Sequence, residues 1–324
     1  MFVVGVDENG LGPRLGPLIV TAVTAEATND AGLRIATKPA RGGAASRLAD
    51  SKQLVAYGNS ALGEAWARAL MPDAASPESL LESLFLDPMD VLQTPCPRDH
   101  MAQCWRAGES FESTDEVLAL VKKDTARLAK RGLRLVRAEV AFVCTRVLND
   151  AAAKGRSRFV VDLNTMERLV LSARARVGSD LHAVCGKVGG FDRYGGQFGP
   201  LSRYLHVALV EGRARSEYKF PGVGTVAFVR DADASSSLVS LASLIGKWAR
   251  DLLTARVIRH YRDDDATLPN ASGYHDPITA RFVSGTALVR KRRNMPDDCF
   301  ERTKVDHGPT SERSERNSTR RDTT

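Results

Sequence analysis

The start of the chain places two adjacent carboxylates between an apolar stretch and a glycine-rich turn, which limits the folds it can adopt. Residues 2–7 are apolar and β-branched up to Asp7, Glu8 follows, and the turn at 10–13 leads into a second apolar stretch at 16–25. This pattern predicts two paired strands joined by the turn. Successive side chains of a strand point to opposite faces. An Asp-Glu pair at a strand end is therefore costly unless the strand ends at a polar site or a cation binds there.

Two interpretations of the Asp7-Glu8 pair follow from this pattern. Clusters of carboxylate oxygens suit Mg²⁺ or Mn²⁺, which favours a metal site. The alternative is a tight hairpin that carries two solvated acids, because turns of polar residues and glycine are common.

The composition indicates a protein with a sizeable core and an anionic partner. The chain has 324 residues with 43% hydrophobic content, enough for one large or two small domains. Its net charge of +7 favours nucleic acid, the commonest anionic partner. No apolar run approaches the ~20 residues of a membrane span, and the N-terminus lacks the features of a signal peptide. We therefore expect a cytoplasmic protein that does not bind membranes.

The cysteines are few and scattered. There are five of them without a CxxC pair, which favours reduced thiols in a reducing compartment. Cys96, His100 and Cys104 have the spacing of a partial metal site, but the sequence offers no evident fourth ligand nearby.

The rest of the chain alternates predicted strands and helices. We expect helices near 62–70, 116–130 and 238–261, and strands at 133–142, 181–185 and 223–229. Residues from 72 to about 130 look like a helical or irregular insertion into one domain that spans residues 1–300. Residues 301–324 are charged and poor in apolar side chains, which predicts a disordered tail.

Residues 158–176 fit two structures. Phe159-Val160-Val161-Asp162 could be a strand that ends in an acid. However, Phe159, Leu163, Met166 and Val170 recur at helical spacing, which favours a helix that carries Asp162.

Acids follow several of the predicted elements. Asp7-Glu8 ends one strand, Asp231-Ala232-Asp233 follows another, and Asp162 is a further candidate. Acids gathered from distant strands are what two-metal phosphoryl transfer requires, because two cations about 4 Å apart activate water and stabilise the leaving oxygen. The 238–261 helix also carries Lys247, Arg250, Arg256 and Arg259 on one face, which is either solvated or directed at phosphates.

Four segments, in order, carry recognisable motifs. They are Asp7-Glu8-Asn9-Gly10-Leu11-Gly12-Pro13 with Gly16-Pro17, Leu48-Ala49-Asp50-Ser51-Lys52-Gln53-Leu54, Ala242-Ser243-Leu244-Ile245-Gly246-Lys247-Trp248-Ala249-Arg250-Asp251, and Gly273-Tyr274 followed by the basic stretch Arg290–Arg293. Together they resemble the motifs of the type 2 ribonucleases H, which comprise ribonuclease HII and its archaeal and HIII relatives. The resemblance spans about residues 3–293, with a longer middle than typical members have.

This resemblance implies a fold and an activity. The fold would be α/β and ribonuclease H-like, with a mixed central sheet flanked by helices. The activity would be endonucleolytic cleavage of the RNA strand of RNA–DNA hybrids with Mg²⁺ or Mn²⁺. The partner would be nucleic acid, and we expect a monomer.

The resemblance also implies roles for individual residues. Asp7, Glu8 and Asp233 match metal-binding catalytic acids, with Asp231 as the nearby alternative to Asp233. The glycine-rich turn would face a 2′-hydroxyl. Lys52 and Lys247 would face the nucleic-acid backbone, and Tyr274 would stack on a sugar or base. The implied substrate-binding residues are Gly10, Leu11, Gly12, Lys52, Ser243, Lys247 and Tyr274.

Two departures from the family pattern keep other functions open. Leu11 stands where the family has arginine. The family's third acid, at the end of a central strand, is either Asp162 or is lost at Cys185, which precedes Gly186. Cysteine is a poor ligand for Mg²⁺. The alternatives are a catalytically impaired nucleic-acid-binding protein on the same fold and a metal-dependent DNA nuclease, and fold alone does not decide among them.

Overall fold

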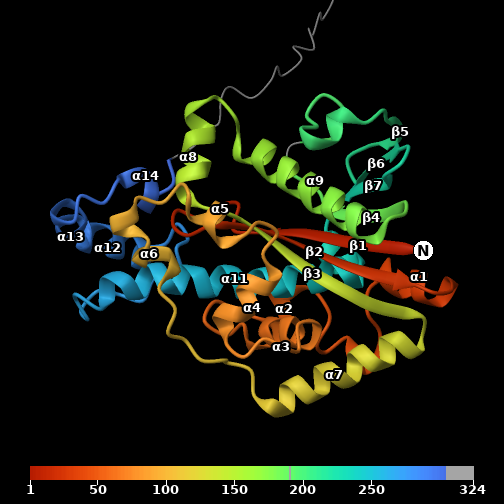
Figure 1. Cartoon of the computed structure of the whole chain (residues 1–324), viewed down its shortest axis with the longest axis horizontal. Coiled ribbons are helices and arrows are strands. Elements are labelled where there is room, and N and C mark those ends of the chain that lie inside the picture. The colour runs from red at the N-terminus through yellow and green to blue at the C-terminus, as the bar shows by residue number, and fades with distance from the viewer. Residues whose placement is uncertain (190, 304–324) are drawn as a thin grey trace, which may run out of the picture.

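A single mixed β-sheet forms the centre of the protein in this computed structural model, which describes residues 1–189 and 191–303 (Figure 1). Its seven strands lie in the order β3-β2-β1-β4-β7-β6-β5. Their bounds are β1 Phe2–Asn9, β2 Leu18–Ala27, β3 Leu133–Val143, β4 Leu181–Gly186, β5 Val207–Glu211, β6 Arg215–Phe220 and β7 Gly224–Val229.

The strand directions place the ends of the central strands at one edge of the sheet. β1, β4 and β7 run parallel to one another, whereas β2 is antiparallel to β1 and β6 is antiparallel to β7. The predicted pairing of the first two strands is confirmed, since Phe2 lies opposite Glu26 and Asn9 opposite Ile19. This mixed central sheet, flanked by helices, confirms the expected α/β architecture.

The helices predicted near 62–70, 116–130 and 238–261 are all present. Residues 158–176 are helical rather than extended, as the helical spacing favours. The helices are α1 Asp30–Ala36, α2 Ser51–Leu54, α3 Ala61–Leu70, α4 Pro77–Leu84, α5 Met89–Gln93, α6 Ala102–Trp105, α7 Asp115–Lys130, α8 Thr145–Ala153, α9 Arg158–Val177, α10 Ala232–Ser235, α11 Ser237–Arg262, α12 Pro277–Gly285, α13 Ala287–Arg292 and α14 Asp297–Phe300. Three short 3₁₀ turns are η1 Gly42–Ala44, η2 Arg98–His100 and η3 Pro200–Arg203.

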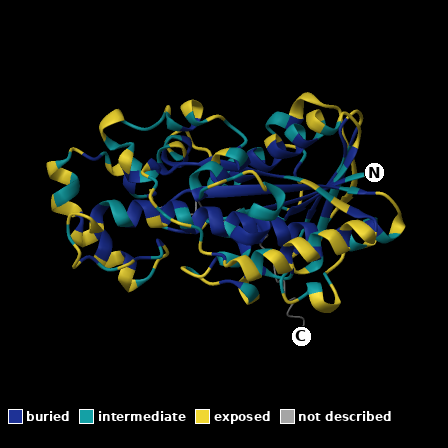
Figure 2. Ribbon diagram, turned by 60° about the horizontal axis from the view of Figure 1, so that its bottom comes forward, coloured by how far each residue is buried: buried dark blue, intermediate teal, exposed yellow. Residues whose placement is uncertain are grey.

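Two long helices cover opposite faces of the sheet, α11 on one and α9 on the other (Figure 1). Gly5 lets β1 lie close to α11, because a Cβ at this position would meet the Leu238 carbonyl carbon at 2.4 Å. Val4 and Val6 point the other way and pack with apolar side chains of α9. The buried residues therefore form two layers around β1, which Figure 2 shows as a dark blue centre.

The predicted insertion at 72–130 contributes to the main core. Leu80, Leu84, Trp105 and Val121 are buried in the cluster that also contains Trp248 of α11. The division of the chain into a domain with an insertion stays a prediction. In the described part of the chain, no helix combines the length and apolar character needed to cross a bilayer.

The beginning of the predicted tail belongs to the fold. Arg302 is buried, with 2% of its surface exposed. The expectation of disorder from residue 301 therefore does not hold for residues 301–303, and residues 304–324 lie outside the described part of the chain.

Candidate active site

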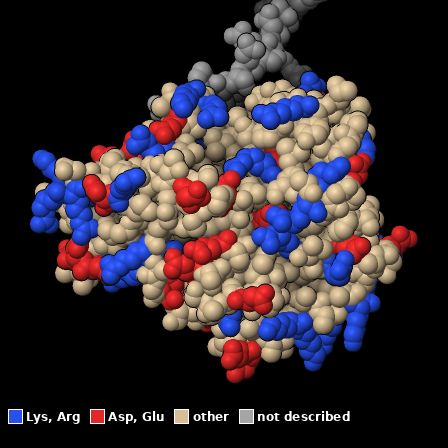
Figure 3. Space-filling view, viewed as in Figure 1, with Lys and Arg blue, Asp and Glu red and all other residues tan. Residues whose placement is uncertain are grey.

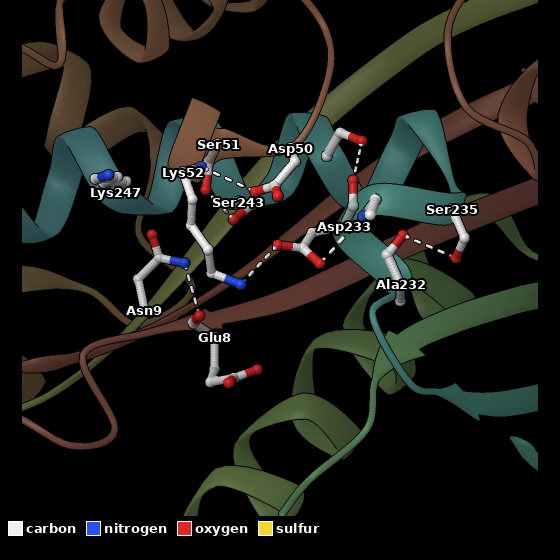
Figure 4. A network of polar contacts seen from close by, with 12 residues as sticks. Glu8, Asn9, Asp50, Ser51, Lys52, Ala232, Asp233, Ser235, Ser243 and Lys247 are labelled. Atoms are coloured by element: carbon white, nitrogen blue, oxygen red, sulfur yellow. Dashed lines mark hydrogen bonds and ion pairs between the residues drawn. The ribbon is translucent and has the colours of Figure 1, made fainter. Parts of the chain in front are cut away.

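An open cavity of about 270 Å³ lies where β1, β4 and the start of α10 meet. Asp7, Glu8 and Asp233 line it together, although they are far apart in the sequence. The full lining is Asp7, Glu8, Asn9, Gly10, Ser51, Lys52, Gly186, Lys187, Asp231, Ala232, Asp233, Ser243, Lys247, Arg250 and Tyr274. Figure 4 shows the polar contacts around it.

The sheet and two helices position the acids. Asp7 lies on the same face of β1 as Gly5, toward α11, and Glu8 lies on the opposite face, toward α9. Asp233 belongs to the short helix α10, which follows β7 almost directly. Asp231 precedes this helix with a φ of 50°, a conformation that aspartate tolerates better than most residues. Both Asp231 and Asp233 line the cavity, so the structure leaves each of them available to it.

Burial opposes the negative charge of the acids in this site. It raises the pKa of Asp7 well above its usual range, and the neighbouring Glu8 adds to the effect, while a hydrogen bond with Ser243 partly offsets it. Burial, together with the charge of Asp162, raises the pKa of Glu8 to about 8. A cation stabilises buried, mutually repelling carboxylates of this kind, because its charge offsets both their desolvation and their repulsion.

Lys52 supplies a positive charge to the acids. Its Nζ lies 3.3 Å from Asp233 Oδ2, and this contact raises the pKa of the lysine (Figure 4). The backbone places it there, because Asp50 caps α2 by accepting a hydrogen bond of 2.9 Å from the Lys52 N–H. The Ser51 and Ser243 hydroxyls, 2.9 Å apart, join α2 to α11. Lys52 itself is 76% exposed at its side chain and can therefore reach a ligand in the cavity.

The other side of the cavity is cationic and aromatic. The Arg250 guanidinium carbon lies 4.7 Å from the centre of the Tyr274 ring, a cation–π contact. Tyr274 is 46% exposed. Lys247 donates to the Val55 carbonyl at 2.7 Å, and burial lowers its pKa. Arg250 belongs to the basic helix face that the sequence predicts to be either solvated or directed at phosphates, and it lines the cavity three residues after Lys247.

The remaining basic residues of α11 do not form a phosphate-facing or solvated face as a group. Arg256 is buried, and its Nε donates to Glu109 Oε1 at 2.5 Å. Arg259 donates to the other oxygen of Glu109 at 3.0 Å. Both interpretations of the helix face are therefore wrong for Arg256, which serves a buried ion pair.

In the basic stretch Arg290–Arg293, two residues form ion pairs and two are exposed. Arg290 donates to Asp297 at 2.7 Å, and Arg293 forms an ion pair with Asp264. Lys291 and Arg292 are exposed and available to an anionic partner. Over the face of the molecule in Figure 3, basic and acidic side chains are interspersed rather than separated.

Asp162 lies behind the cavity rather than in its lining. It is fully buried on α9, and neither of its carboxylate oxygens has a hydrogen-bond partner among the described residues. Burial raises its pKa well above the usual range, with a further contribution from Asp7. Cys185 is also buried, on β4 opposite Val6, and burial and Asp162 raise the pKa of its thiol. The structure thus brings Asp162 and Cys185 to the same region but places neither in the cavity wall.

Gly186 lies directly beside the carboxylates of Asp7 and Glu8. A Cβ on this residue would lie 2.9 Å from Asp7 Oδ1 and 3.2 Å from Glu8 Oε2. The glycine therefore keeps space open at the carboxylates.

The glycine-rich turn contributes unequally. Gly10 lines the cavity with a φ of 88°, a conformation that favours glycine. Leu11 packs against the core on the α9 side, and Gly12 is not part of the cavity lining.

The acids have the right chemistry for a hard cation but do not form a ready-made metal centre. Among the described residues, no group of three or more His, Cys, Asp or Glu side chains is placed to hold a metal ion. The donor set of Asp7, Glu8 and Asp233 is entirely oxygen, as Mg²⁺ and Mn²⁺ prefer. The positive charge that lowers the pKa of Asp7 and Glu8 comes from the exposed Lys52. The three carboxylates therefore fit a bound cation, whose charge would further offset their own.

The Cys96–Cys104 segment forms a different environment. Cys96, His100 and Cys104 line an apolar cavity of about 30 Å³ together with Cys144 and Cys299. All of these thiols are free.

Comparisons with known proteins identify only distant structural neighbours. No family model and no curated protein matches the chain. Ribonuclease HII from Archaeoglobus fulgidus, solved in a complex with PCNA, has a TM-score of 0.41 at 15% identity over 94% of this chain and 95% of that one. Ribonuclease H2 from Pyrococcus horikoshii OT3 has a TM-score of 0.35 at 17% identity over 93% and 92% of the two chains. Bst-RNase HIII in complex with Mn²⁺ has a TM-score of 0.43 at 12% identity, over 93% of this chain and 66% of that one. Similarity at this level assigns no role to any residue of this chain.

Proposed function

We propose that this chain is a divergent ribonuclease HII-like endonuclease that cleaves the RNA strand of RNA–DNA hybrids by metal-dependent phosphodiester hydrolysis. The proposal rests on one observation. Asp7, Glu8 and Asp233 line a single open cavity whose lining also includes Lys52, Lys247 and Arg250. Carboxylates that hold cations beside side chains that bind phosphates are what cleavage of a nucleic-acid backbone needs.

Each group in the cavity has a defined part in this proposal. Asp7, Glu8 and Asp233 would hold Mg²⁺ or Mn²⁺, and a divalent cation bound there supplies an activated water and stabilises the leaving oxygen. Lys52 and Lys247 bind the phosphates of the backbone. The exposed ring of Tyr274 stacks on a sugar or base, and Arg250 holds that ring from behind. Gly10 brings the backbone of the turn close to the ribose.

A second function has its own supporting observation. The end of β4 carries the buried Cys185 and then Gly186, and Asp162 is absent from the cavity lining. A site that lacks the acid expected at the end of the central strand binds cations weakly. The chain would then be a catalytically impaired protein that binds nucleic acid on the same fold.

The deciding experiment is cleavage of an end-labelled RNA–DNA hybrid with Mg²⁺, with Mn²⁺ and with a chelator. We expect the wild type to cleave only with metal, and Asp7→Asn to abolish cleavage because it removes a charge that holds the cation. Asp233→Asn and Asp231→Asn form a matched pair, since asparagine tolerates the backbone conformation of residue 231. We expect only the first of these two to abolish cleavage.

The same assay separates the two functions. Loss of cleavage in Asp162→Asn assigns the third acid to α9. An inactive wild type that binds the hybrid and gains activity with Cys185→Asp supports the binding protein. An active wild type that Asp7→Asn leaves unchanged would refute the ribonuclease H assignment.

A further inference from the structure

Residues 301–303 pack against the glycine-rich turn at 10–16, and the side chain of Arg302 connects the two segments. Its Nη1 donates to the carbonyls of Gly10 at 2.6 Å and Leu11 at 3.3 Å. Its Nε and Nη2 donate to the Gly16 carbonyl at 3.0 and 2.7 Å. One side chain therefore binds both ends of the turn that begins the cavity wall at Gly10.

The segment that carries Arg302 is itself held on two sides. The Arg302 backbone N–H donates to the Arg14 carbonyl at 3.0 Å, and the Arg14 side chain pairs with Glu301 at 2.5 Å. Asn149 of α8 donates to the Glu301 carbonyl at 2.9 Å and accepts from the Thr303 N–H at 2.8 Å. These contacts fix residues 301–303 against both the turn and α8, so Arg302 has a defined position.

The charge of Arg302 serves the turn alone. The side chain is buried, and none of the ion pairs among the described residues involves it. Burial lowers its pKa, and the nearby Arg158 and Arg250 lower it further. A buried cation is costly unless its donors are used. Here the carbonyl oxygens of the turn accept them.

We propose that Arg302 is a positioning residue that holds the 10–16 turn in the conformation that binds nucleic acid. In a trans peptide the C=O of one residue and the N–H of the next point in opposite directions, and the described chain has no cis peptide bond. Because the Gly10 and Leu11 carbonyls point at the guanidinium, the N–H groups of Leu11 and Gly12 point away from it. These N–H groups are donors for the oxygens of a sugar–phosphate backbone. This role rests on the proposed function for its ligand, the sugar–phosphate backbone of an RNA–DNA hybrid.

The test compares Arg302→Ala with Arg158→Ala. Arg158 is a matched control because it donates to the Thr303 carbonyl, in the same segment, but makes no hydrogen bond to the turn. We expect Arg302→Ala to speed amide hydrogen exchange at Arg14 and Leu15, whose N–H groups in the same turn donate to the Gly273 carbonyl, and to weaken hybrid binding by about tenfold. Arg158→Ala is expected to leave both quantities near wild type. Addition of methylguanidinium to Arg302→Ala should restore both, whereas methylammonium, which lacks the planar set of donors, should not.

The outcomes distinguish this inference from the proposed function. If the wild type fails to bind the hybrid, the proposed function fails, and the exchange measurement still tests the hold of Arg302 on the turn. If Arg302→Ala matches the wild type in both exchange and affinity, the positioning role is refuted. If Arg302→Ala does not fold, Arg302→Lys is measured instead, and wild-type exchange at residues 14 and 15 in that variant would equally refute the role.

Discussion

Replacing Asp162 by asparagine is expected to stabilise the protein at pH 8. The residue is fully buried on α9, both carboxylate oxygens lack hydrogen-bond partners in the described structure, and Asp7 raises its pKa further. Asparagine has nearly the same shape and carries no charge. Its NH₂ group is also a donor in a region that is rich in acceptors.

The size of the effect follows from the cost of an unsatisfied buried polar group. Such a group costs about 1–3 kcal/mol. In a chain of this size each kcal/mol changes the melting temperature by about 2 °C, so the expected rise is about 2–6 °C. The sign depends on pH. The folded-state pKa of Asp162 is raised, so the part of the penalty that comes from its charge is absent below the unfolded pKa of about 3.9. The wild type loses stability as the pH rises from there toward the folded pKa.

The assay is thermal unfolding and urea unfolding of wild type and variant at pH 8 and at the lowest pH at which both fold, with a chelator present. Glu167→Gln is the control on the same helix. Glu167 is buried too, but it accepts hydrogen bonds from the backbone of Leu201 at 2.7 Å and of Gly199 at 3.0 Å. Loss of these charge-assisted bonds should destabilise the control by about 1–3 kcal/mol. If Asp162→Asn destabilises the protein as much as Glu167→Gln, Asp162 has a partner and the reasoning is wrong.

Other consequences of the structure can be checked independently. The apparent affinity for Mn²⁺, measured by calorimetry, should rise with pH up to about 8, because Glu8 must lose its proton before it binds a cation. Gly186→Ala should lower that affinity, since its Cβ would lie 2.9 Å from Asp7 Oδ1; unchanged affinity would mean that the neighbours move freely. Hybrid binding should weaken steeply between low and moderate salt because counterions are released, and a flat response would exclude binding through phosphates. Truncation after residue 303 should leave the melting temperature unchanged, whereas truncation after 300 should lower it because Arg302 is lost.

Local patterns in the sequence predict the elements that carry the first acids. The apolar run before Asp7 and the turn after Glu8 predict the strand end, and helical spacing through Leu163 and Met166 identifies α9. Asp233 follows a predicted strand, but its assignment to the site rests on the resemblance and stays a prediction. For the strand end and for α9 the signal lies within a few residues, where the periodicity of one element is sufficient.

Features made by distant contacts are not predicted in this way. Arg302 lies in a segment whose average composition predicts disorder, but a single buried side chain that binds Gly10 and Gly16 makes it part of the fold. Strand β5 is exposed along its whole length, although four of its five residues are apolar, so its sequence does not predict its exposure. Strand β6 does alternate, with Ser216, Tyr218 and Phe220 buried, and the period of two would have identified it.

The third acid depends on the sheet register, which only the structure supplies. Cys185 lies opposite Val6 and therefore on the α9 face of the sheet, in the same buried region as Asp162. Asp162 already raises the pKa of Glu8 on this side of the sheet. An acid at 185 would add a third like charge without a counter-ion, whereas the neutral thiol adds none. For this reason the effect of Cys185→Asp on cleavage is best measured in the Asp162→Asn background, where the new carboxylate meets no second charge on α9.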